Sequence, residues 1–78
     1  MQELQLSNLR PGEACQLKSI GQFGSLRRRL RDLGMQPGCQ IQCAFWAPSG
    51  SPMAFWIKGA MIALRKSDCQ KILVTRCE

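Results

Sequence analysis

The chain has 78 residues and a formal net charge of +6, from 11 lysine and arginine residues against 5 acidic ones, and it contains no histidine. A chain this short is expected to form one domain, residues 1–78, with a thin core. The absence of histidine excludes a Ser-His-Asp triad, a cysteine–histidine pair and a Cys₂His₂ zinc site. The basic charge favours an anionic partner: nucleic acid, an anionic membrane surface or an acidic protein.

The apolar segments and the cysteines bear on the compartment. No apolar segment approaches the roughly 20 residues that cross a bilayer, and the first residues carry no basic or apolar leader, so we predict a cytoplasmic protein. The five cysteines lack C-x-x-C spacing. Cys39 and Cys43 would lie roughly 13 Å apart in a strand, too far for a disulfide. We expect Cys15, Cys39 and Cys43 to be small core residues, whereas Cys69 and Cys77 are less clearly buried.

Turn residues and period-two patterns define the predicted strands in chain order. A short helical turn beginning at Ser7-Asn8 and a tight turn at Pro11-Gly12 come first. Strands are predicted at Ala14–Ile20, Cys39–Trp46, Met53–Lys58, Ala60–Arg65 and Ile72–Arg76, with a helical turn at Ser67–Gln70 whose N-cap is Ser67. In the second strand Cys39, Ile41, Cys43 and Phe45 are placed on one face and Trp46 on the other.

One helix is predicted, over Ser25–Leu33. Leu26, Leu30 and Leu33 recur at i, i+4 and i+7, and Phe23 extends the same apolar stripe. Gly34 is placed to end the helix in the left-handed conformation, and Arg28 can pair with Asp32. About five short strands with one short helix after the first strand predict a mainly β fold, a small closed or nearly closed barrel.

The chain resembles the FeoA family from about Leu6 to Val74, and four segments with the family's order and spacing carry the resemblance. Residues 26–38, LRRRLRDLGMQPG, resemble its L-R-R-R-L-x-x-L-G-hydrophobic-x-P-G helix and turn. Residues 47–52, APSGSP, resemble its A-P-x-G-D-P turn, with Ser51 in place of the aspartate. The serine side chain would cap the turn more weakly than an aspartate. Residues 6–12, LSNLRPG, and 63–67, ALRKS, resemble its L-x-x-L-x-P-G and A-L-R-x-x segments.

The resemblance implies an SH3-like β-barrel that acts in the cytoplasm beside FeoB, the membrane transporter of Fe²⁺ with a GTP-binding domain. The expected function is a non-enzymatic adaptor or regulator of ferrous iron uptake. It would dock on the cytosolic side of FeoB, at the inner face of the plasma membrane, and would need no cofactor. A homo-oligomer is left open, because an exposed strand edge could support a dimer.

The hypothetical partner-binding residues are Arg27, Arg28, Arg31, Trp46 and Trp56. Guanidinium groups recognise carboxylates and phosphates through a bidentate fork, and tryptophan is enriched at binding hot spots. Each assignment has a simpler alternative. The arginines can form a solvated helix face, and the tryptophans can pack between neighbouring strands.

Three other functions were weighed. A transition-metal-binding or metal-sensing module is suggested by the thiols and the iron context, but the cysteine spacing offers no ligand pair of the usual kind, and the metal ligands stay unknown. A nucleic-acid partner is not expected, because aromatic stacking platforms among basic residues are scarce. An enzyme is not expected, because a domain of this size has little room for a deep pocket.

Overall fold

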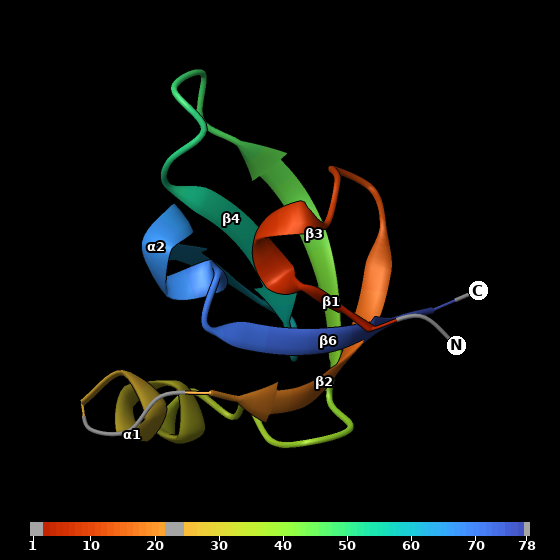
Figure 1. Ribbon diagram of the computed structural model, residues 1–78, viewed down its shortest axis with the longest axis vertical. Helices are drawn as coiled ribbons and strands as arrows, with labels where there is room; N and C mark the ends of the chain where they lie inside the picture. Colours follow the sequence, from red (N-terminus) through yellow and green to blue (C-terminus); the bar gives the residue numbers. More distant parts are fainter. Residues whose placement is uncertain (1–2, 22–24, 78) are drawn as a thin grey trace.

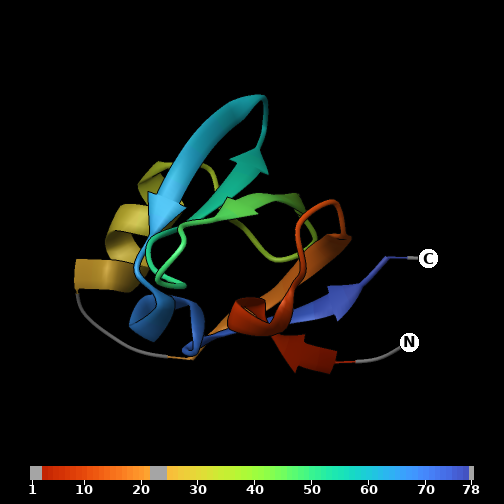
Figure 2. The same ribbon diagram turned by 90° about the horizontal axis from the view of Figure 1, so that it is seen from above.

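The computed structural model describes residues 3–21 and 25–77. These contain strands β1 (Glu3–Gln5), β2 (Ala14–Ile20), β3 (Gln40–Trp46), β4 (Met53–Ile57), β5 (Ala60–Leu64) and β6 (Ile72–Arg76), helices α1 (Ser25–Asp32) and α2 (Lys66–Cys69), and the 3₁₀ helix η1 (Leu6–Asn8). The strands form one antiparallel sheet in the order β1-β6-β2-β3-β4-β5. The sheet curves strongly around its interior, and α1 lies at one side of it (Figures 1 and 2).

The mainly β fold is confirmed, with two changes to its outline. The sheet is open, since β1 and β5 form its two edges within the described residues and do not pair with each other. The fold is therefore barrel-like rather than a closed barrel. Strand β1 was not predicted, because three residues are too few to show alternation. It pairs with β6, with Leu4 opposite Val74. The predicted helical turn after it is present as η1.

Strands β2 to β6, η1 and both α-helices all contribute side chains to the interior. The buried cluster consists of Leu6, Leu9, Cys15, Leu17, Leu30, Met35, Ile41, Cys43, Met53, Phe55, Ile57, Leu64, Cys69, Ile72 and Val74. Cys15 and Cys43 are core residues as predicted, while Cys39 is only half-buried. Cys69 is fully buried, although its position near the C-terminus left this open.

Helix α1 ends as predicted, but Leu33, the last residue of the predicted stripe, is not buried. Gly34 has φ +96°, the left-handed conformation that glycine adopts readily, and Leu30 is buried. Leu33, however, is 45% exposed. The turn at Gly34 directs the chain back so that the Met35 amide donates to the Leu30 carbonyl at 3.0 Å, and Met35 enters the core instead. Phe23 and the Leu26 side chain lie outside the described residues.

A β-bulge in β3 reverses the predicted facing of its last residues. Cys43 is opposite Phe55, but Phe45 is opposite Ala54, so two residues of β3 match one of β4. Phe45, predicted to face the core, is therefore 51% exposed. Trp46 takes the register opposite Met53, but its side chain is still 40% exposed. Alternation alone could not reveal the bulge.

Helix α2 begins one residue earlier than the predicted turn. Its N-cap is Arg65, which makes no side-chain capping bond, so the predicted cap at Ser67 is wrong. The first amide of α2 is bound by a hydroxyl from a distant turn instead. Ser51 Oγ accepts a hydrogen bond from the Lys66 amide at 3.2 Å. Ser51 thus connects the turn at residues 47–52 to α2. It stands where the FeoA signature has aspartate, a stronger acceptor.

Candidate partner-binding site

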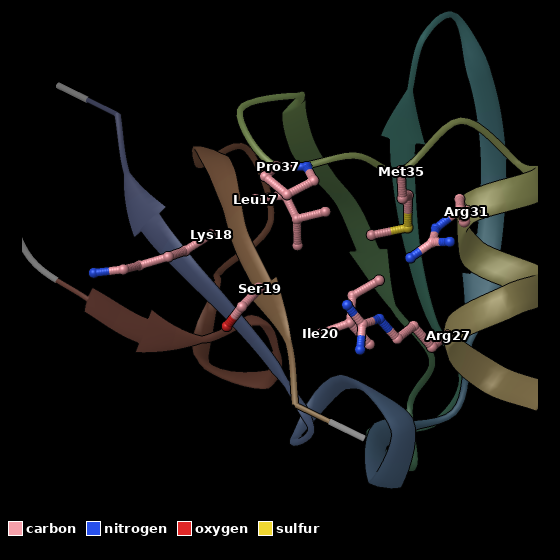
Figure 3. A pocket seen from close by; sticks show the side chains of 8 residues that line it. All are labelled: Leu17, Lys18, Ser19, Ile20, Arg27, Arg31, Met35 and Pro37. Carbon is pink, nitrogen blue, oxygen red and sulfur yellow. The ribbon is translucent and has the colours of Figure 1, made fainter. Parts of the chain in front are cut away.

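A pocket lies between helix α1 and strand β2, with a volume of about 170 Å³. It is lined by Leu17, Lys18, Ser19, Ile20, Arg27, Arg31, Met35 and Pro37 (Figure 3). Its floor is apolar, since Leu17 and Met35 belong to the core. The two arginines of α1 reach across toward β2, and their guanidinium groups lie over Ile20 and beside Met35 (Figure 3).

The helical repeat places these two arginines together. Arg27 and Arg31 are four residues apart on α1, which puts their Cβ atoms about 5–6 Å apart on one face. Leu30 anchors the helix in the core and so fixes which face turns toward β2. Both arginine side chains are exposed at the mouth of the pocket. Two guanidinium groups can therefore approach one bound group from the same side.

Neither arginine of the pocket has an acidic partner within the described residues. The ion pairs found there join Lys18 to Glu3, Arg65 to Asp68 and Arg76 to Glu13. The predicted pair between Arg28 and Asp32 is not among them. Lys18 lines the pocket, but its ammonium group extends away from the two arginines (Figure 3). The donors of Arg27 and Arg31 are consequently available to a ligand.

The remaining predicted site residues are not brought into this pocket. Arg28 is exposed on α1 but does not line it. Trp46 donates its indole N–H to the Leu9 carbonyl oxygen at 3.1 Å, which ties it to the chain just after η1. Trp56 lies elsewhere, opposite Gln42 and Met61 on neighbouring strands. Of the predicted residues, only Arg27 and Arg31 therefore share the α1–β2 pocket, while Arg28, Trp46 and Trp56 lie outside it, each in a different place.

Trp56 belongs to an exposed apolar row on the outer face of the sheet. Trp56 is 44% and Met61 47% exposed, and they are cross-strand neighbours. Beside Trp56 is an open hollow of about 340 Å³, lined also by Cys39, Gln40, Gln42, Lys58 and Gly59. Sequence reasoning missed Met61, although the alternation of β5 could have indicated it. It also missed the pocket floor at Ile20 and Met35, because no pattern shows which side chains a helix covers.

Three of the thiols, those of Cys15, Cys43 and Cys69, are poor metal ligands in this arrangement. Burial raises the pKa of Cys15 from 9.0 to about 12, with the nearby Cys77 thiol as a further cause, and burial also raises the pKa of Cys43. Burial, followed by the Asp68 carboxylate, raises the pKa of Cys69 to about 12. Metal binding needs the thiolate. Across the described part of the chain, no group of three cysteine, aspartate or glutamate residues converges as a metal site would require.

The curved antiparallel sheet with its short helices defines a small, mainly β, SH3-like domain. The chain belongs to the FeoA family, since the model of the FeoA domain matches residues 4–76. This confirms the resemblance seen in the sequence and connects the protein with ferrous iron transport. A comparison with curated proteins returned no match.

Solved structures of FeoA proteins match nearly the whole chain. An FeoA-like protein from Clostridium acetobutylicum is 27% identical with a TM-score of 0.89, over 100% of this chain and 91% of that one. FeoA from Chlorobium tepidum is 28% identical with a TM-score of 0.92, over 96% of this chain and 71% of that one. FeoA from Stenotrophomonas maltophilia, an SH3 domain protein complexed with zinc, is 25% identical with a TM-score of 0.80, over 91% of this chain and 88% of that one.

Neither α1 nor α2, nor any other helical segment of residues 3–21 and 25–77, has the length and apolar character that a bilayer crossing requires.

Proposed function

We propose that this protein is a cytoplasmic adaptor of ferrous iron uptake that docks on the cytosolic side of the FeoB transporter and regulates it without catalysing a reaction. One observation carries the proposal beyond family membership. Arg27 and Arg31 direct guanidinium groups into an apolar-floored pocket and form no ion pair within the described residues. Exposed, uncompensated donors beside apolar surface are a feature of recognition surfaces, where arginine is enriched.

Such an adaptor would act by population shift. A protein that binds one conformation of the transporter more tightly than another raises the population of that conformation. If the two conformations differ in bound guanine nucleotide, the adaptor changes nucleotide turnover or gating without chemistry of its own. The size of the effect is limited by the difference in its affinity for the two conformations.

A pull-down of the cytosolic part of FeoB, with and without guanine nucleotide, tests the proposal. The wild-type protein is expected to be retained, with nucleotide-dependent yield. The double variant Arg27→Glu/Arg31→Glu is expected to be lost from the bound fraction while its circular dichroism spectrum stays native. Absence of wild-type binding in every nucleotide state would contradict the adaptor function, and undiminished binding of the double variant would remove α1 from the interface.

A metal-binding module is the second candidate, favoured by the zinc complex of the Stenotrophomonas relative. The donor set of this chain does not fit it well. The thiols of Cys15 and Cys69 are buried with raised pKa values, and no three-donor cluster is found in the described residues. Calorimetric titration of the reduced protein with Fe²⁺ and with Zn²⁺ distinguishes the two candidates, since stoichiometric heat would favour the metal-binding one.

A further inference from the structure

We infer that the α1–β2 pocket recognises a carboxylate next to an aliphatic side chain, in an extended acidic segment of a protein partner. Only the assignment of that segment to the transporter rests on the proposed function. The pocket combines two features, a pair of guanidinium groups and a small apolar floor. Each feature selects a different part of the ligand.

The arginine pair selects a planar anion. Arg27 and Arg31 approach from one helix face, and each guanidinium can donate two parallel hydrogen bonds to a carboxylate. No described carboxylate lines this pocket, because Glu3, Glu13 and Asp68 pair with other cations and Asp32, although it lies on α1, is not among the lining residues. An anion bound between the two arginines would therefore come from another molecule.

The electrostatics of α1 point the same way. Arg27 lies in the first turn, where the positive end of the helix dipole disfavours a cation, and that turn contains no acidic residue. Arg27 and Arg31 are also like charges at i, i+4, a spacing that destabilises an isolated helix by a few tenths of a kcal/mol. An anion bound between the two arginines would relieve both effects.

The floor selects a peptide rather than a nucleic acid or a free phosphate. The half-buried Ile20 presents apolar surface next to the guanidinium groups, and the nearly fully buried Leu17 and Met35 form the floor of the pocket. A phosphate group would leave that surface uncovered, and none of the pocket's lining residues is an aromatic on which a base could stack. A volume of about 170 Å³ suits one aliphatic side chain rather than a cofactor, whose pockets are typically about 300 Å³ or larger.

Chemical-shift titration of the ¹⁵N-labelled protein tests the inference with matched probes. The probes are a blocked Leu-Glu-Leu-Glu peptide, the same peptide with glutamine for glutamate, inorganic phosphate and a mixed-sequence single-stranded RNA. The acidic peptide is expected to shift amides of β2, α1 and Met35, and the glutamine peptide to bind about tenfold more weakly. Equal shifts with both peptides, or tighter binding of phosphate or RNA, would overturn the inference.

Variants separate the pocket from the general positive charge of the helix. Arg27→Gln/Arg31→Gln is expected to weaken acidic-peptide binding about tenfold or more without lowering the melting temperature, since it removes a repulsive pair. Arg28→Gln lies on the same helix outside the pocket and should change the affinity less than about twofold. An equal loss in both variants would mean that charge alone, and not the pocket, accounts for binding.

The outcome also distinguishes this inference from the proposed function. If FeoB binds the wild type and Arg27→Gln/Arg31→Gln equally well, the assignment of the acidic segment to the transporter fails while the adaptor function stands. If FeoB binds neither but the acidic peptide still requires both arginines, the pocket assignment stands and the transporter is not the partner.

Discussion

The helices that pack against the curved sheet differ in how deeply they are buried. The 3₁₀ helix η1 and the four-residue helix α2 contribute the fully buried Leu6 and Cys69 to the core, and Leu9, directly after η1, is fully buried as well. The eight-residue helix α1, by contrast, has Leu30 as its only buried side chain among those described, and Leu33 and the arginines are exposed. Helix length is therefore a poor guide to burial here. The longer helix contributes chiefly to the surface, which is what a recognition element requires.

The largest expected effect contrasts two leucines of the α1 segment. Leu30→Ala is expected to lower the free energy of unfolding by about 3–5 kcal/mol, because it leaves a cavity in the core at the only described anchor of the helix. Leu33→Ala removes the same atoms from a half-exposed position and should cost less than about 1 kcal/mol. Urea unfolding followed by tryptophan fluorescence measures both.

Two results would change this view of α1. Similar losses in the two variants would mean that Leu33 packs as firmly as Leu30 and that the predicted apolar stripe is correct after all. A small loss for Leu30→Ala would mean that the core is stable without the helix. The α1–β2 pocket would then lack a fixed wall.

The next effect concerns the buried thiols of Cys15 in β2 and Cys69 in α2. Burial raises the pKa of Cys15 and of Cys69 to about 12 in the folded protein, from the 9.0 of an exposed thiol, which is the value expected for the unfolded chain. Above pH 9 the unfolded chain releases protons that the folded chain retains, so stability falls as pH rises, until the folded thiols also ionise near pH 12. From pH 9 to pH 10 the loss is about 1 kcal/mol for each thiol, about 2 kcal/mol in total.

Unfolding under reducing conditions at several pH values measures this dependence. The double variant Cys15→Ala/Cys69→Ala provides the control, since it should show a shallower decline between pH 9 and pH 10 even though its stability at pH 7 is lower. An unchanged slope would indicate that the two thiols ionise in the folded protein at ordinary pH. They would then be accessible to oxidants and metals.

Local patterns in the sequence predicted most of the strands because period-two alternation is a property of a few adjacent residues. Strands β2 and β6 have the predicted bounds, and β3, β4 and β5 differ by one residue at one end. What could not be predicted depends on distant partners. Strand β1 exists through its pairing with β6, the bulge at Cys43–Phe45 through the register with β4, and the pocket through the placement of α1 against β2. The arginines were proposed from their type and helix position, while the apolar floor beneath them had no local signal.

The smallest expected effect is on stability, and it compares the two tryptophans. Trp46→Phe keeps an aromatic ring but removes the donor to the Leu9 carbonyl oxygen, and is expected to lower the free energy of unfolding by about 1 kcal/mol. Trp56→Phe removes an indole N–H from the exposed outer face and should change stability by less than about 0.5 kcal/mol. Thermal unfolding measured by circular dichroism compares them. If the two changes proved equal, the bond from Trp46 would contribute nothing to holding the segment after η1.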